Sequence, residues 1–393
     1  MFEWSRVESY GTVLSYATVA VFVILFVMLV YGKFKIPRTR KCLLIFVLFL
    51  FAFAIRLPMA LIHEISFDEH YYISAGLHYM EGRFLVNYEH PPFIKYMLGA
   101  YLKMLYPTAY QDYWDVNVSD YKLLILSRLF IVLFGALSVV PLYFIAEMVV
   151  GEGFGLIAAF FFAINPAHAR ISGLVYLDAP MIFFGLCAVL AALYFLEKPG
   201  WKTMSLCGVA NGLLFATKWL QPVLFIIPTT LFAIIFYRKK KTFVLYALSL
   251  IIGLAILIAF WIPQLYLFNF RICDFISLIN QHWKPELTHP ERDFLSQILY
   301  NVTFAEFILY IFCLIALPVL LVLNYKKGAN IQPSQFFPLL STTTFTILVY
   351  IEVRKALHYL IPIFPFIALV VAQTLCLISQ FRQTQRSGRT SMR

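Results

Sequence analysis

Two adjacent carboxylates, Asp68 and Glu69, open a polar segment soon after an apolar run. A carboxylate within hydrogen-bond reach of a hydroxyl group can take its proton while a new bond forms at the oxygen. Neighbouring carboxylates push their pKa values apart, so one of the two can be reactive while the other positions a substrate. The pair could instead hold a cation, or simply begin a solvated loop.

Further polar groups stand at the ends of apolar runs or between them. His90 precedes two prolines and Lys95, whereas Arg170, Asp178 and Lys218 each adjoin a long apolar stretch. An unpaired charge beside hydrocarbon is costly, so such cations are usually paired or functional, and they could bind a lipid phosphate. The structural alternatives are that Lys95 and Lys218 reach the membrane interface along their aliphatic stems, and that Asp178 caps the helix that follows it.

Histidine and cysteine do not form a metal-binding pattern in this chain. The sequence has eight His and six Cys residues, without an HExxH or CxxC spacing. Hard cations would also prefer more carboxylates than the histidine-rich segment supplies. We therefore expect neither an obligatory metal or other cofactor nor a disulfide framework.

The composition is that of a polytopic helical membrane protein. Of 393 residues, 62% are hydrophobic and only 13% are charged, with a mean hydropathy of +0.81. Soluble chains are about 45–50% apolar and about 25% charged, so soluble enzymes, disordered proteins and nucleic-acid-binding proteins are excluded. The net charge of +11 fits the excess of Lys and Arg in the cytoplasmic loops of membrane proteins.

A spanning helix needs about 20 apolar residues, and on this basis we predict about eleven spans. The first run is too long for a signal peptide and lacks its small-residue cleavage site, so we count it as a span. The predicted spans cover residues 12–32, 42–62, 123–147, 154–170, 178–196, 203–217, 221–237, 242–262, 304–323, 334–351 and 357–379.

Basic clusters orient these spans. The clusters at residues 33–41, 198–202, 238–241, 326–327 and 382–393 all fall on one side when the spans alternate, and that side is assigned to the cytoplasm. The N-terminus and two long connections, 63–122 and 263–303, then lie outside. Within the first connection, residues 70–80 and 92–106 repeat apolar residues at helical spacing, which predicts helices lying in the membrane interface.

We find no internal repeat and no separate soluble domain, and expect one membrane domain over residues 1–393. The charge-derived orientation brings the polar residues singled out above to one face, although it was assigned without them. Residues placed on the outer face are Asp68, His90, Arg170, Asp178, Lys218 and His358. Scattered structural residues would divide between the two faces, so this convergence indicates one site.

The order of these motifs resembles the protein O-mannosyltransferase family. The first outer connection carries Arg56 and Pro58, then Phe67-Asp68-Glu69, and later His90-Pro91-Pro92 with Lys95. Three later segments resemble the family too: His168 to Arg170 with Leu177-Asp178, Gly212 to Lys218-Trp219, and His358-Tyr359 with Pro362. The resemblance implies an all-α GT-C fold and a polyprenyl-phosphate (dolichyl-phosphate) sugar donor.

The same resemblance implies roles for individual residues. Asp68 is expected to be the general base and Glu69 a neighbour that orients the sugar or the acceptor. Residues expected at the donor phosphate are Arg170, Lys218, His90 and Lys95. Residues expected to line the substrate site are Asp178, Tyr72, Trp219, His358 and Tyr359.

The function expected from the sequence is transfer of a hexose, mannose by resemblance, to a hydroxyl, with inversion. The acceptor implied is Ser or Thr of a protein, at the extracytoplasmic or luminal face of the cell membrane or the endoplasmic reticulum. The related aminoarabinose transferases carry KPP where this chain has His90-Pro91-Pro92, so transfer to a lipid or a cell-wall glycan is an alternative. Secondary transport and a non-catalytic scaffold are weaker alternatives, because no repeat is present and the charges lie at span ends.

Overall fold

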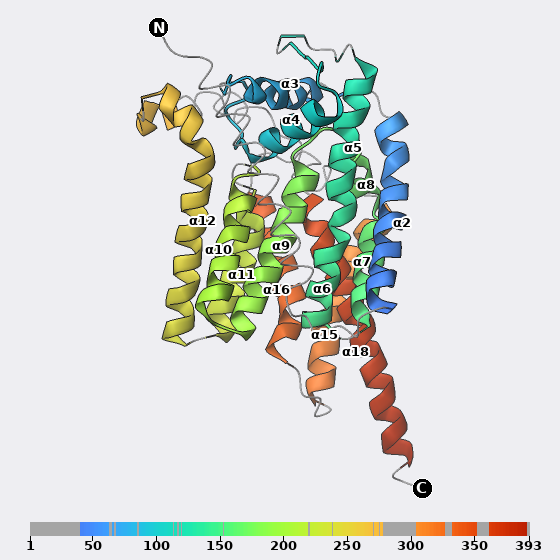
Figure 1. Cartoon of the computed structure of the whole chain (residues 1–393). Helices are drawn as coiled ribbons and strands as arrows, with labels where there is room; N and C mark the ends of the chain where they lie inside the picture. Colours follow the sequence, from blue (N-terminus) through green and yellow to red (C-terminus); the bar gives the residue numbers. More distant parts are fainter. Residues whose placement is uncertain are drawn as a thin grey trace.

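Helices follow the apolar runs of the sequence in the computed structural model (Figure 1). The structure describes residues 40–390 with gaps at 63–64, 67, 85, 113, 116–117, 119, 152, 219–220, 238, 270, 275, 278–303, 327–331 and 352–360. The described residues contain helices and connecting segments and no β-strand. The main bundle helices are α2 (Arg40–Ile62), α5 (Tyr121–Leu137), α6 (Val139–Val149), α7 (Phe154–Ala163), α9 (Asp178–Glu197), α10 (Trp201–Phe215), α11 (Val223–Phe236), α12 (Lys240–Leu267), α15 (Phe304–Lys326), α16 (Phe337–Ile351) and α18 (Phe364–Thr390).

Every predicted span from 42–62 onward coincides with helical structure, whereas the predicted span 12–32 lies outside the described residues. Five stretches in the described part are long and apolar enough to cross a membrane, and three shorter apolar helices accompany them. The predicted all-α membrane fold is therefore confirmed, while the number of eleven crossings stays a prediction. The five stretches are Lys41–Leu61, Tyr121–Val149, Asp178–Glu197, Lys240–Leu267 and Ile361–Gln380.

Two short helices lie across one end of this bundle, as the sequence predicted. They are α3 (Glu69–Met80) and α4 (Phe93–Leu105), drawn at the top of Figure 1. They cross at Gly76 and Gly99, where a Cβ on Gly99 would lie 2.0 Å from the carbonyl oxygen of Gly76. Glycine at both positions thus brings the two backbones into direct contact, and the pair forms a layer over the bundle.

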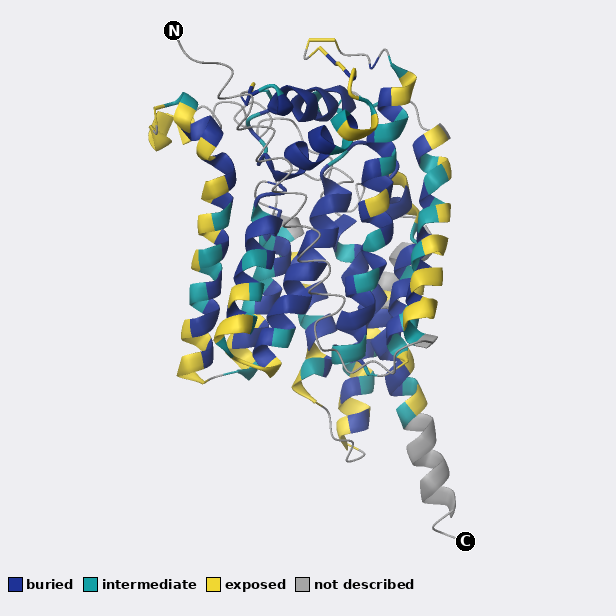
Figure 2. Ribbon diagram, in the orientation of Figure 1, coloured by how far each residue is buried: buried dark blue, intermediate teal, exposed yellow. Residues whose placement is uncertain are grey.

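The bundle core centres on α9, and the peripheral helices carry exposed apolar side chains. Figure 2 shows α9 buried along its length, while α2 and α12 have exposed residues on their outward sides. The helix α10 holds α12 through a GxxxG pair, Gly208 and Gly212, whose Cβ atoms would lie within 3.0 Å of α12 atoms. Small residues let membrane helices approach this closely, so close dispersion contacts at this crossing help to hold α12 in place, beside a hydrogen bond from Gln264 of α12 to the hydroxyl of Tyr79 on α3.

The charge-derived orientation agrees with the arrangement of the helices. In Figure 1 the helix α12 begins at the end of the bundle opposite α3 and α4, so Lys240 and Lys241 lie far from Asp68. Lys41, at the start of α2, forms an ion pair of 3.4 Å with Glu147, near the end of α6. Positive charge therefore gathers at the end of the bundle that lacks the α3–α4 layer.

Candidate active site

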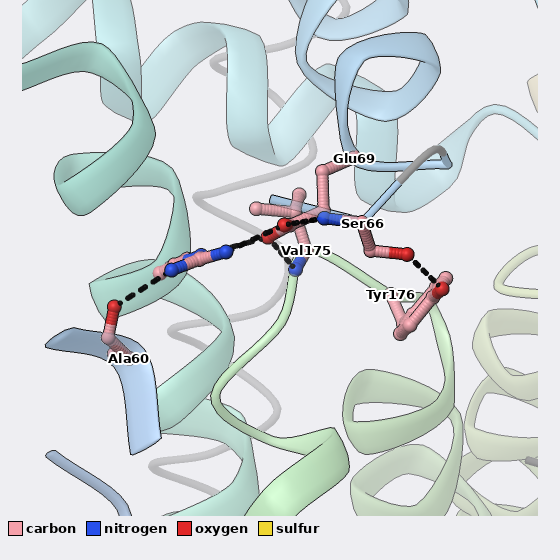
Figure 3. Close-up of polar contacts among 6 residues, drawn as sticks. Ala60, Ser66, Glu69, Val175 and Tyr176 are labelled. Atoms are coloured by element: carbon pink, nitrogen blue, oxygen red, sulfur yellow. Dashed lines mark hydrogen bonds and ion pairs between the residues drawn. The ribbon is translucent and has the colours of Figure 1, made fainter. Parts of the chain in front are cut away.

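Glu69 holds several elements together at the end of the bundle that α3 and α4 cover, which we call the outer end (Figure 3). Arg128 of α5 donates two hydrogen bonds to its carboxylate, from Nε to Oε1 at 2.8 Å and from Nη2 to Oε2 at 2.7 Å. The backbone N–H groups of Val175 and Ser66 donate to the same two oxygens, at 2.9 and 2.8 Å. Arg128 also donates to the carbonyl of Ala60, at 3.0 Å. A carboxylate has about four acceptor sites, so the acceptor capacity of Glu69 is filled by the protein itself.

A second buried cation, Arg56, ties α2 to the end of α7. Its guanidinium donates to the carbonyls of Ala52 and Ala163, at 2.9 and 3.0 Å, and approaches Nδ1 of His168 at 2.8 Å. Because a guanidinium has only N–H donors, Nδ1 of His168 accepts this bond. His168 belongs to the short helix α8 (Pro166–Ile171), which begins with a cap from Asn165. These contacts hold α8 against α2 and the end of α7, just before the segment that leads to α9.

Asp68 stands where the chain enters α3, and it is half-buried. Its side chain makes no capping bond to the helix start. One turn later, burial raises the pKa of Tyr72 well above its usual value, and the negative charges of Asp68, Asp178 and Glu89 raise it further. Three carboxylates from separate parts of the chain therefore lie close enough to act on the hydroxyl of Tyr72.

Tyr176 faces the same group of side chains from the segment between α8 and α9. Its hydroxyl lies 2.5 Å from the hydroxyl of Ser66, and its ring meets Tyr72 edge-on with centroids 6.4 Å apart. Burial raises the pKa of Tyr176 to about 12, with the charges of Asp68 and Asp178 acting in the same direction. Both tyrosines are consequently neutral hydroxyl donors at physiological pH.

Lys218 forms a buried ion pair with Asp178, the first residue of α9. Its Nζ lies 2.8 Å from Oδ1, and the two side chains are 7% and 2% exposed. Lys218 sits in the turn after α10, where the carbonyl of Ala216 accepts a hydrogen bond of 3.2 Å from the N–H of Phe93, the first residue of α4. This backbone bond joins the Lys218 turn to the His90-Pro91-Pro92 segment.

The turn at residues 87–90 presents His90 to Tyr72, whose ring lies 5.8 Å away. Asn87 adopts a left-handed backbone with φ 51°, and its side-chain amide donates to Glu89. Lys95 of α4 is completely buried and donates its Nζ to the carbonyls of Asn87 and His90, the latter at 2.8 Å. His90 thus belongs to a turn whose backbone carbonyls are held by the buried Lys95 side chain.

The described structure does not place the remaining predicted site residues in this group. Arg170, at the end of α8, is exposed and makes no ion pair with the described residues. Its proposed contact with a donor phosphate stays a prediction. Trp219, His358 and Tyr359 lie outside the described residues.

The group that is brought together contains a carboxylate that could accept a proton and hydroxyl and ammonium groups that could donate hydrogen bonds. We name it the outer cluster and define it as Asp68, Tyr72, Glu89, His90, Tyr176, Asp178 and Lys218. It combines a half-buried carboxylate with hydroxyl donors and a cation. No group of three or more His, Cys, Asp or Glu side chains gathers in a metal-binding arrangement in the described part of the chain, and the expectation of a metal-free reaction stays a prediction.

The family model for dolichyl-phosphate-mannose-protein mannosyltransferases matches residues 43–279, which include every described member of the outer cluster. The chain belongs to that family. The resemblance predicted from the motifs is therefore confirmed. Dolichyl-phosphate-mannose–protein mannosyltransferase 1 of Saccharomyces cerevisiae is 29% identical over 196 residues, which is 46% of this chain and 23% of the yeast protein. The chain thus covers less than a quarter of that relative's length.

Solved structures share the fold of this mannosyltransferase-family chain at low sequence identity. ArnT from Cupriavidus metallidurans, bound to undecaprenyl phosphate, has a TM-score of 0.59 and 17% identity, covering 86% of this chain and 60% of ArnT. The oligosaccharyltransferase of Archaeoglobus fulgidus in its apo form has a TM-score of 0.54 and 12% identity, covering 91% of this chain and 52% of the archaeal protein. Both confirm the predicted GT-C-like membrane fold.

The sequence analysis did not assign three residues to this site. Glu89 and Tyr176 belong to the outer cluster, and Arg128 forms the ion pair with Glu69. For Arg128 a signal was available, because it is the only charged residue between Leu123 and Ala146 in the apolar run. A lone charge in such a run is expected to have a partner, and the only question was which carboxylate. Glu89 and Tyr176 lie in the segments that resemble the family, next to His90 and Leu177-Asp178, but were assigned no role, since polar residues in such segments are common.

Proposed function

We propose that this protein is a membrane glycosyltransferase that moves mannose from a dolichyl- or polyprenyl-phosphate donor to a Ser or Thr hydroxyl of a protein. The family membership supports the donor and the sugar. The observation that carries the proposal is the outer cluster, in which a half-buried carboxylate, Asp68, shares one end of a membrane bundle with the buried pair of Asp178 and Lys218.

The reaction is a single displacement at the anomeric carbon. The acceptor oxygen forms a bond to that carbon while the bond from carbon to phosphate oxygen breaks, and the lipid phosphate leaves with the electron pair. Asp68 takes the hydroxyl proton, and the configuration of the sugar inverts because attack and departure occur on opposite faces. Lys218 offsets the growing negative charge of the phosphate, and Asp178 holds the ammonium in place. Asp68 and Lys218 together supply the base and the cation, so we expect no metal requirement.

The location follows from the same reasoning. Apolar helices and family membership make the chain an integral membrane protein. We place the outer cluster on the extracytoplasmic or luminal face, because the basic ends of the helices lie at the opposite end of the bundle. The donor phosphate would then sit at the membrane interface, with its lipid chain in the bilayer.

The proposal is tested with purified protein in lipid nanodiscs. The assay supplies polyprenyl-phosphate mannose carrying a radiolabel and a peptide containing Ser and Thr, with the same peptide carrying Ala at those positions as the matched control. We expect label in the first peptide only, with the anomeric configuration inverted, and no change on adding EDTA. Label transferred only to a lipid or glycan acceptor would contradict the protein acceptor, and donor use without any acceptor would contradict transfer itself.

A further inference from the structure

Lys95 is a lysine that no substrate can reach in this structure. Its side chain is 0% exposed, although it belongs to the outer layer of helices and not to a membrane span. Its Nζ donates to the carbonyls of Asn87 and His90, and it lies 5.4 Å from the centre of the Tyr79 ring on α3. The nitrogen is thus enclosed by the turn on one side and by an aromatic face on the other.

Two further hydrogen bonds are described within the turn that Lys95 braces. One is the N–H of His90, which donates to the carbonyl of Asn87 at 3.4 Å, and another is the amide of Asn87 to Glu89. The backbone of Asn87 is left-handed, a conformation that most residues avoid and that neighbouring contacts must maintain. Without Lys95, the carbonyl of His90 would lose its donor, and the carbonyl of Asn87 would keep only the bond of 3.4 Å from the N–H of His90.

We infer that Lys95 is a positioning residue, which fixes the 87–90 turn so that His90 and Glu89 face Tyr72 in the outer cluster. It does so by donating to two backbone carbonyls and not by contacting the donor phosphate. This inference concerns the same site as the proposed function. Only its expected effect on turnover rests on that function, and the structural role of Lys95 does not.

The charges around Lys95 are compatible with this role. Burial lowers the pKa of Lys95 to about 7, and the negative charge of Glu89 opposes that shift. The other group that faces it, the Tyr79 ring, attracts the protonated form. A neutral amine still has two N–H donors, which is the number the two carbonyls use, so the brace holds in both protonation states.

The experiment compares Lys95→Met with Lys103→Met in the full chain. Lys103 is a matched control because it also lies on α4 and also donates to a backbone carbonyl, that of Ala109 at 2.9 Å, but away from the outer cluster. Hydrogen–deuterium exchange is followed over the backbone of residues 86–90, and donor KM and kcat are measured in the transfer assay. If Lys95→Met does not accumulate, Lys95→Gln, which keeps an amide N–H₂ of shorter reach, replaces it.

We expect exchange in residues 86–90 to rise by about tenfold or more in the Lys95 variant alone. We also expect its kcat to fall by about ten- to a hundredfold with donor KM nearly unchanged, because a misplaced group mainly weakens the reaction step. Unchanged exchange with a raised donor KM would overturn the inference and favour direct phosphate binding. Since exchange needs no substrate, an inactive wild type would contradict the proposed function while the exchange result still decided the role of Lys95.

Discussion

The carboxylate of Glu69 and the guanidinium of Arg128 form a bidentate ion pair, although the residues lie 59 positions apart in the chain. Their side chains are 0% and 1% exposed. Asp68, the preceding residue, is instead half-buried and takes part in the outer cluster. Two adjacent carboxylates therefore have different surroundings: Glu69 is buried among its hydrogen-bond donors, whereas Asp68 is half-buried in the outer cluster.

The first prediction concerns the stability that this pair provides. Glu69→Gln leaves Arg128 buried without a counter-charge, and removing one partner of a buried pair costs about 3–5 kcal/mol. We expect a correspondingly lower free energy of unfolding, measured by denaturant titration in detergent. The control is Glu81→Gln at the far end of α3, where the carboxylate is 32% exposed and pairs with Arg83 at the surface. That change should cost at most about 1 kcal/mol, and equal losses in both variants would contradict the prediction.

The second prediction concerns Asp68 as the general base. Asp68→Asn keeps the size of the side chain but cannot accept the proton, so kcat should fall by about 10²–10⁴-fold. The unfolding temperature and the binding of the donor should stay close to wild type, because the side chain does not cap α3. Both are measured on the purified variant beside its turnover. A folded variant with more than about a tenth of wild-type turnover would rule out the role.

The third prediction concerns Lys218 and its partner. Lys218→Met should lower kcat/KM for the donor by the equivalent of about 1.5–3 kcal/mol, the usual contribution of a charge-assisted hydrogen bond. Asp178→Asn should lower it less, since the cation stays but is held less firmly. Steady-state kinetics with varied donor concentration give both values. A Lys218 variant with normal donor dependence would show that the ion pair is only structural.

The fourth prediction concerns the crossing of α3 and α4. Gly99→Ala places a methyl group 2.0 Å from the carbonyl oxygen of Gly76, so the helices must separate. Overpacking of this kind costs about 1–3 kcal/mol, and the shift should also reduce turnover, because both helices carry residues of the outer cluster or its support. Gly200→Ala is the control, since its Cβ would meet only Thr203, at 3.9 Å. Thermal unfolding of the two variants measures the difference, and equal unfolding temperatures would contradict the crossing.

The fifth prediction concerns pH. The pKa of Lys95 is lowered to about 7 in the folded protein, chiefly by burial, from its ordinary value of 10.5. Between these values the unfolded chain binds more protons, so the free energy of unfolding should rise with pH by up to about 1.4 kcal/mol per pH unit. Below the folded pKa this slope vanishes. The difference in unfolding free energy between wild type and Lys95→Met, measured from about pH 6 to about pH 9.5, should show this rise. Parallel curves would mean that Lys95 stays charged when buried.

Helices and their placement could be predicted because they depend on local patterns. The interfacial helices expected at 70–80 and 92–106 are α3 and α4. They could be predicted because apolar residues recur at helical spacing within an otherwise polar connection. Alternation of basic clusters placed the outer cluster opposite Lys240, because that rule follows from membrane insertion and not from tertiary packing.

The partners of individual charges could not be predicted in the same way. Glu69 accepts bonds from residues 59 and 106 positions away, and no local pattern encodes such distances. The same holds for Lys95. Its place in an interfacial helix suggested that its side chain would reach the membrane interface, whereas the packing of α4 against α3 and the 87–90 turn buries it. Asp178 and Lys218 were each expected at the site, but their ion pair required the ends of α9 and α10 to meet.

The contacts of Glu69 also set an order of events during synthesis. The ribosome delivers Glu69 well before Arg128, and Val175 later still, so of these donors only the N–H of Ser66 is present until α5 and the segment after α8 have been made. Arg128 in turn enters the membrane within an apolar helix and is neutralised only when it finds Glu69. A substitution at either residue would thus act first on the nascent chain, and a lowered yield of inserted protein would precede any change in the rate of sugar transfer.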